Sequence, residues 1–173
     1  MRLPLCCSKD KQIVVAVGGV KNSGKTTLIT KLIPELRERG YQVATIKHDG
    51  HEFEGDVEGT DTYKHSKAGA YGTAIFSKGQ FVIRKQSTVT EQELLLMFPE
   101  ADIIILEGFK HSTYPKVEVI RQENSTESVC NRNGLFAIVT DTDLEIPGIK
   151  TIQINDIKNV ADSILEYFMK RDN

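Results

Sequence analysis

The stretch at residues 19–26, Gly-Val-Lys-Asn-Ser-Gly-Lys-Thr, constrains this chain more than any other. It has the G-x-x-x-x-G-K-T pattern of a phosphate-binding loop, a pattern that also occurs by chance. A continuous apolar, β-branched run precedes it at 13–17, as in a strand buried on both faces. Apolar residues at helical spacing follow from Leu28 to Leu36, and Gly40 marks the helix end. This order of strand, loop and helix predicts a nucleotide site rather than a plain glycine turn.

In such a loop, backbone N–H groups and the following helix N-terminus face a polyphosphate. We expect Lys25 to reach the β- and γ-phosphates, as one of two catalytic residues, and the Thr26 hydroxyl to bind Mg²⁺. The other predicted nucleotide-binding positions of the loop are Gly19, Asn22, Ser23 and Gly24.

The remaining elements predict an α/β fold with a mostly parallel β-sheet flanked by helices, the P-loop NTPase fold. Polar turn residues between the apolar runs 72–76 and 81–84 add a β-hairpin insertion. Asn155 is expected to cap a last helix with one apolar stripe. Residues 1–11 are expected to form a flexible arm, and residues 12–173 a single nucleotide-binding domain. Further buried strands are expected at 41–47, 102–106, 117–120 and 135–139, with a short one at 151–154.

Composition and charge narrow the class of protein. The 173 residues carry a formal net charge of -2, so no basic field points to nucleic acid as the main partner. No apolar run is long enough to cross a bilayer, so we expect no membrane partner. The cysteines are Cys6, Cys7 and Cys130; an odd set with two adjacent members does not resemble a disulfide framework. We therefore expect a reducing, cytoplasmic location.

An acidic residue near the Mg²⁺ is the second requirement of a phosphate-binding loop. Glu107 follows the apolar run 102–106 directly, and Gly108 lets the backbone turn toward the γ-phosphate. We expect Glu107 to hold a Mg²⁺-bound water and to be the second catalytic residue. The alternative is a glutamate that merely emerges at a strand end.

The acidic, glycine-rich loop at 49–61 follows a strand end, where ligands bind in open α/β sheets. Asp61 is its best candidate for contact with Mg²⁺ or substrate, with a helix N-cap as the equal alternative. His48 and His51 are expected to contact phosphate or an anionic substrate, and metal binding is the less specific alternative.

Two further positions have competing interpretations. Lys110 and His111 supply two cations that would neutralise substrate phosphate, unless they form a solvated loop pair. Asp141 follows the run 136–140 and would accept hydrogen bonds from guanine N1–H and N2–H₂, which adenine does not offer. The full Asn-Lys-x-Asp motif of typical GTPases is absent, and a plain turn residue is the alternative.

Five segments occur in a characteristic order along the chain: Gly19 to Thr27, Thr45-Ile46-Lys47-His48, Gly59-Thr60-Asp61-Thr62-Tyr63, Ala68-Gly69-Ala70 and Leu106-Glu107-Gly108-Phe109-Lys110. Together they resemble the molybdopterin-guanine dinucleotide biosynthesis adapter family, MobB, over the chain from about Gln12 to the final helix. The chain departs from the family's pattern after His48, because Asp49 and Gly50 intervene before His51.

The resemblance implies a GTP-binding homodimer with weak intrinsic GTPase activity, at most a slow GTPase acting as an accessory factor. It would assist a MobA-type guanylyltransferase in attaching GMP to molybdopterin, with contact to molybdopterin itself. By matching segment, the phosphate role extends to Thr27, and the magnesium role falls on Thr26 and Glu107. Lys47, His48, Asp61 and Lys110 inherit a looser role around the nucleotide or the pterin.

Three other functions compete with the adapter. A P-loop small-molecule kinase or ligase of the dethiobiotin-synthetase type also places Glu-Gly after a buried strand. None of the arginines after the first helix (Arg84, Arg121, Arg132 and Arg171) forms an obvious phosphate clamp, which favours slow hydrolysis. A metallochaperone GTPase would need a clear Cys/His ligand set, and a purely structural domain would leave the phosphate loop unexplained.

Overall fold

The structure is a computed structural model that describes residues 12–50, 53 and 55–171. The predicted arm at 1–11, with Cys6 and Cys7, and the predicted anion contact His51 lie outside the described residues. The chain divides into two compact units. The first unit holds Met1–His48 and Leu95–Asn173, and the second unit holds Asp49–Leu94.

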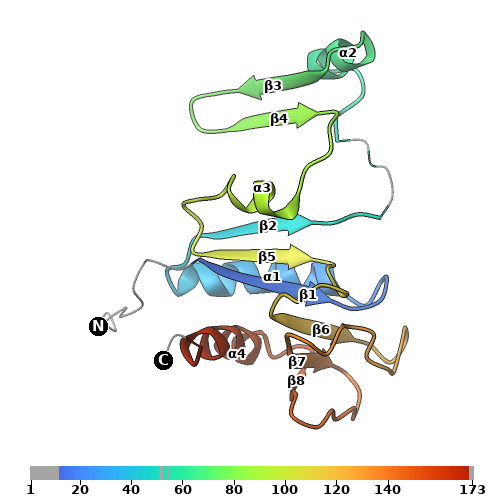
Figure 1. The fold of residues 1–173 in the computed structure, drawn as a ribbon, viewed down its shortest axis with the longest axis vertical. Coiled ribbons are helices and arrows are strands. Elements are labelled where there is room, and N and C mark those ends of the chain that lie inside the picture. Colours follow the sequence, from blue (N-terminus) through green and yellow to red (C-terminus); the bar gives the residue numbers. More distant parts are fainter. Residues whose placement is uncertain (1–11, 51–52, 54, 172–173) are drawn as a thin grey trace. The chain divides into compact units, whose positions relative to one another are not determined.

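A six-stranded sheet forms the centre of the first unit, in the order β2-β5-β1-β6-β7-β8 (Figure 1). Every neighbouring pair is parallel, which confirms the predicted parallel sheet. Its inner strands are almost wholly buried: β1, β5 and β7 are apolar on both faces, whereas β6 carries buried Lys116 and Glu118 on one face. The strands are β1 (Ile13–Gly18), β2 (Val43–Lys47), β5 (Ile103–Glu107), β6 (Lys116–Ile120), β7 (Leu135–Thr140) and β8 (Lys150–Gln153).

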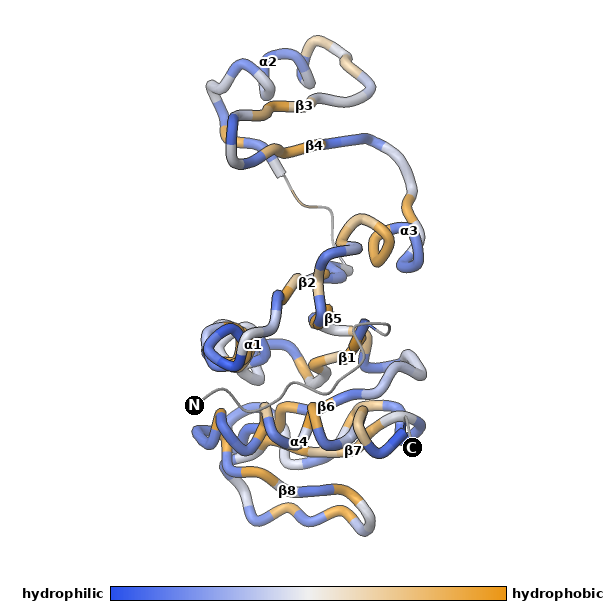
Figure 2. The backbone as a smooth tube through the Cα atoms, turned by 90° about the vertical axis from the view of Figure 1, so that its left-hand side faces the viewer, coloured by the Kyte–Doolittle hydropathy of each residue, from blue (hydrophilic) through white to orange (hydrophobic). Residues whose placement is uncertain are grey.

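Two helices pack on one face of this sheet, α1 (Lys25–Glu38) and α4 (Ile157–Met169). The predicted stripe of α4 is confirmed, and Figure 2 shows apolar and polar residues alternating along it. The predicted cap of α4 is wrong by one residue. Asp156, not Asn155, is the N-cap, because its carboxylate accepts a hydrogen bond from the Asn159 N–H at 3.2 Å.

Loop segments pack against the opposite face near β6. Lys116 Nζ donates to the carbonyl oxygens of Ser112 (2.5 Å) and Asn133 (3.2 Å). The Glu118 carboxylate accepts from residues 128–130. Both charged side chains are fully buried, so the segments 112–115 and 128–134 are anchored to β6 from the inside.

The second unit contains α2 (Asp61–Lys67), β3 (Gly72–Phe76) and β4 (Phe81–Lys85), and α3 (Glu91–Leu95) ends one residue beyond it. Strands β3 and β4 form an antiparallel two-stranded sheet, which confirms the predicted hairpin. In the described part of the chain, no helix combines the length and the apolar character that a membrane span requires.

Candidate functional site

The phosphate loop leaves β1 in a conformation that only certain residues adopt. Gly19, Asn22 and Gly24 all have positive φ, at 133°, 61° and 94°. A Cβ on Gly19 would also lie 2.5 Å from the Val119 carbonyl oxygen of the neighbouring strand. The first glycine of the motif is therefore required both by backbone conformation and by close packing against β6.

The loop wraps around the start of α1. Gly24 is the N-cap and offers no side chain to the first N–H groups of the helix, so these remain oriented toward an external anion. Ser23 is fully buried, and within the described chain its hydroxyl has no hydrogen-bond partner. Thr27 lies in the exposed first turn of α1.

Lys25 folds back over the loop. Its ammonium donates to the Val20 carbonyl at 2.6 Å and to the Gly19 carbonyl at 3.4 Å. Burial lowers the pKa of Lys25 from its ordinary value; the charge of Glu107 opposes this shift and the charge of Lys110 adds to it. The ammonium thus bonds to carbonyl groups of the loop itself.

Thr26 and Glu107 meet across the carboxyl edge of β1 and β5. The Thr26 hydroxyl donates to Glu107 Oε1 at 2.7 Å. Glu107 is mostly buried, and Lys47 Nζ lies 4.0 Å from the same oxygen. A hydroxyl and a carboxylate are oxygen ligands of the kind that Mg²⁺ takes, directly or through water. The pair therefore fits Mg²⁺, although among the described residues no group of three or more His, Cys, Asp or Glu side chains could hold a metal ion.

Other predicted residues gather beside Glu107. The His48 N–H donates to the Glu107 carbonyl at 3.2 Å, and its ring meets the Phe109 ring edge-on at 5.7 Å between centroids. A Cβ on Gly18 would lie 3.6 Å from the Lys110 Cα. Lys110 therefore lies at the same edge of the sheet. Together with Lys25 and Lys47 it gives this edge positive charge that would attract an anion.

Asp61 belongs to the second unit, as the first residue of α2. The N-cap of that helix is Thr60, whose hydroxyl accepts from the Tyr63 N–H at 3.3 Å, so the alternative that Asp61 is the cap is wrong. The Asp61 side chain is exposed and lies 3.3 Å from Lys64 Nζ. A role for Asp61 toward Mg²⁺ or substrate stays a prediction.

Asp141 follows β7, and both of its carboxylate oxygens face the segment after β6. Oδ1 accepts from the Gln122 N–H at 2.9 Å, and Oδ2 lies 3.6 Å from Arg121 Nε. These contacts use the same two oxygens that would accept hydrogen bonds from guanine. Guanine recognition by Asp141 stays a prediction.

The sequence interpretation missed two residues of this site. Arg121 follows β6, and a Cβ on Gly24 would lie 3.6 Å from its Cδ and 4.0 Å from its Nη1. The Asn124 side-chain amide donates to the Asn22 carbonyl of the loop. Arg121 carries the same signal as Glu107, a charged residue directly after a buried strand. The strand order is needed to interpret it, because only the pairing of β6 with β1 shows that Arg121 lies beside the phosphate loop.

Comparison with known proteins places this arrangement in a recognised family. Residues 14–141 match the family model described as "Molybdopterin guanine dinucleotide synthesis protein B" (MobB). The chain is 32% identical over 169 residues to the molybdopterin-guanine dinucleotide biosynthesis adapter protein of Escherichia coli (strain K12). The match covers 92% of this chain and 95% of that one.

A second relative is the probable molybdopterin-guanine dinucleotide biosynthesis adapter protein of Bacillus subtilis (strain 168). It is 35% identical over 120 residues, which are 67% of this chain and 69% of that one. The crystal structure of Bacillus subtilis MobB superposes with a TM-score of 0.71 at 30% identity, covering 89% of this chain and 96% of that chain.

Proposed function

Because this chain belongs to the family of molybdopterin guanine dinucleotide synthesis protein B and is an adapter protein of that synthesis, we propose that it binds GTP with Mg²⁺ at residues 19–27. The observation that carries the proposal is the 2.7 Å contact between Thr26 and Glu107 beside Lys25. It brings the three side chains that a phosphate-binding loop uses to one strand edge.

On nucleotide binding, the Lys25 ammonium leaves the Gly19 and Val20 carbonyls for the β- and γ-phosphates. The Thr26 hydroxyl and the Glu107 carboxylate would hold Mg²⁺, Glu107 through a water, and the ion would supply positive charge against the triphosphate. The residues of the chain thus position the triphosphate, and the Lys25 ammonium offsets part of its negative charge.

We propose that hydrolysis is slow. Fast GTPases use an arginine or a comparable cation at the γ-phosphate. In the described part of the first unit, the arginine that lies beside the loop is Arg121, on the β6 side, whereas Glu107 is on the β5 side. Such a site suits a protein that presents GTP to a partner.

The partner we propose is a MobA-type guanylyltransferase that joins GMP to molybdopterin. Family membership supports this partner, and Lys47, His48 and Lys110 supply positive and aromatic groups for a phosphorylated pterin beside the nucleotide. A small-molecule kinase and a metallochaperone are disfavoured, since 92% of the chain aligns with the Escherichia coli adapter protein. A guanylyltransferase assay at limiting GTP tests the role: molybdopterin guanine dinucleotide forms faster when this protein is added, and no stimulation contradicts it.

We also propose a homodimer formed through the second unit. Strand pairing puts Phe76 opposite Phe81 and Ile75 opposite Val82, so apolar pairs stand on both faces of the hairpin. All four side chains are more than half exposed. A two-stranded sheet alone is marginal in water, and a second copy of this hairpin supplies an equally apolar cover.

The nucleotide site is tested with Lys25→Ala. Removing the ammonium takes away the loop's contact with the β- and γ-phosphates, so we expect GTP affinity to fall at least about 100-fold, measured by titration of a fluorescent GTP analogue with Mg²⁺. Lys31→Ala changes an exposed lysine further along α1; it is the matched control and should bind like the wild type. Equal GTP affinity of the Lys25 variant and the wild type would refute the site.

A further inference from the structure

We propose that Arg121 is a nucleotide-binding residue that contacts the α- and β-phosphates, and that Asp141 positions it. The proposal rests on the nucleotide site proposed above. It assigns a chemical role to the segment after β6.

Strand order places Arg121 at the loop. β6 pairs with β1 in the register Gly18↔Glu118, so the chain leaves both strands side by side. Arg121 then follows β6, and a Cβ added to Gly24, the N-cap of α1, would lie 4.0 Å from Arg121 Nη1. The N–H groups of the same helix end face the phosphates. A guanidinium here adds a planar, bidentate donor to that anion site.

The side of the loop on which Arg121 lies decides which phosphates it meets. β5 and β6 flank β1 on opposite sides. Glu107, with Thr26, marks the Mg²⁺ and γ-phosphate end on the β5 side. Arg121 on the β6 side therefore faces the opposite end of the polyphosphate, which also exists in GDP.

The guanidinium is held in place and incompletely satisfied. Arg121 Nε is buried and, among the residues that the structure describes, has no hydrogen-bond partner; its carboxylate neighbour Asp141 Oδ2 is 3.6 Å away. About 40% of the side chain is exposed, so its outer end remains open to a ligand. The buried Nε thus faces the Asp141 carboxylate, and the exposed remainder of the side chain leaves guanidinium donors for a phosphate oxygen.

The neighbouring contacts fix the position of Arg121 relative to the loop. Asp141 accepts from the Gln122 N–H, and the Arg121 carbonyl accepts from the N–H groups of Asn124 and Ser125 at 2.9 Å each. The Asn124 amide in turn donates to the Asn22 carbonyl. Asp141 thus acts on the nucleotide through Arg121, which is a different role from reading guanine.

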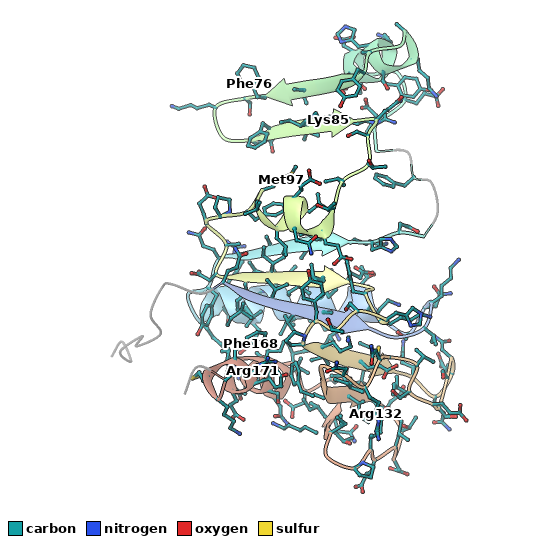
Figure 3. The ribbon with its side chains drawn as sticks, viewed as in Figure 1. Phe76, Lys85, Met97, Arg132, Phe168 and Arg171 are labelled. Carbon is teal, nitrogen blue, oxygen red and sulfur yellow. The ribbon has the colours of Figure 1, made fainter. Side chains whose placement is uncertain are left out.

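The first experiment titrates the full-length Arg121→Ala and Arg121→Lys variants with fluorescent GTP and GDP in Mg²⁺. We expect Arg121→Ala to weaken both nucleotides by a similar factor of about 10 to 100, the range for a charged hydrogen bond, and Arg121→Lys to fall between it and the wild type. Arg132→Ala, an exposed arginine between β6 and β7 (Figure 3), is the matched control and should bind normally.

Each other outcome has a distinct meaning. Wild-type affinity of Arg121→Ala for both nucleotides overturns the proposal, and loss of GTP affinity alone overturns the assigned phosphates. If the wild type itself binds neither nucleotide, the proposed nucleotide site fails instead. Thermal unfolding of each variant, with Arg121→Lys as the better-tolerated change, separates a binding defect from a folding defect.

The second experiment compares Asp141→Asn with the wild type for GTP and ATP. If Asp141 positions Arg121, the variant weakens both nucleotides by the same factor, and Arg121→Ala/Asp141→Asn binds no worse than Arg121→Ala alone. If Asp141 reads guanine, GTP affinity falls selectively and the two substitutions add. That second result overturns the positioning role.

Discussion

Cys130 belongs to the segment 128–134 that packs against the sheet, and it contacts the strand end that precedes the phosphate loop. Its thiol is buried against Gly18: a Cβ added to Gly18 would overlap the Cys130 Sγ atom. Burial raises the pKa of the Cys130 thiol from 9.0 to about 12, and the negative charge of Glu118 adds to the shift. A protein fold that buries this thiol therefore stabilises its neutral form.

This shift predicts a pH dependence of stability. Above pH 9 the unfolded chain loses the thiol proton while the folded chain keeps it, so the contribution of Cys130 declines between about pH 9 and 12, by at most about 1.4 kcal/mol per pH unit. We expect the free energy of unfolding of the wild type to fall more steeply over this range than that of Cys130→Ala, measured by urea unfolding. Parallel pH profiles of the two proteins would contradict the shift.

At the scale of one element, β6 combines an apolar strand with two buried charges. Lys116 and Glu118 point to the same face, two residues apart, and are fully buried. Glu118 accepts from the Ser128 hydroxyl at 2.5 Å and from the N–H groups of Val129 and Cys130 at 2.7 and 3.1 Å. One carboxylate therefore organises the turn that carries Cys130 toward the phosphate loop.

Glu118→Ala leaves these three donors, of which the Cys130 N–H is buried and the other two are part-buried, without an acceptor. We expect a loss of about 3 kcal/mol or more in the free energy of unfolding, because an orphaned donor costs about 1–3 kcal/mol and the Lys116 charge loses its neighbour. Glu127→Ala, an exposed glutamate on the same segment, should stay within about 0.5 kcal/mol of the wild type. Urea unfolding measures both, and equal stability of the two variants would show that the contacts of Glu118 contribute little.

The sequence predicts where the strands of this molecule lie along the chain better than it predicts which strands pair in the sheet. Runs such as 103–106 are buried on both faces, so apolar composition suffices to find them. The Thr26–Glu107 pair also follows from the motif and one strand end. Arg121 does not, because sheet order is a property of non-local pairing that no local pattern encodes. The burial of Lys116 and Glu118 is also not predicted from local sequence, because their hydrogen-bond partners lie up to 17 residues away along the chain.

For the whole molecule, the division into two units separates two kinds of surface. The first unit has a large apolar core between its sheet and its helices, although Leu96 and Met97 are exposed. The second unit carries exposed Ile75, Phe76, Phe81, Val82 and Ile83 on its hairpin, with Phe76 at the end of β3 (Figure 3). Apolar side chains at this density on a short hairpin are typical of an interaction surface.

The proposed homodimer predicts a specific response to charge on that hairpin. Phe76→Arg would place a charge in an apolar contact that occurs twice in a symmetric dimer, so the penalty is doubled. We expect the wild type to sediment as a dimer at micromolar concentration and Phe76→Arg to sediment as a monomer, in analytical ultracentrifugation. Ser87→Arg adds the same charge to an exposed polar position after β4 and should remain a dimer. Nucleotide affinity of the Phe76 variant should be unchanged, because the phosphate loop belongs to the first unit. A Phe76→Arg dimer as tight as the wild type would exclude this hairpin as the interface.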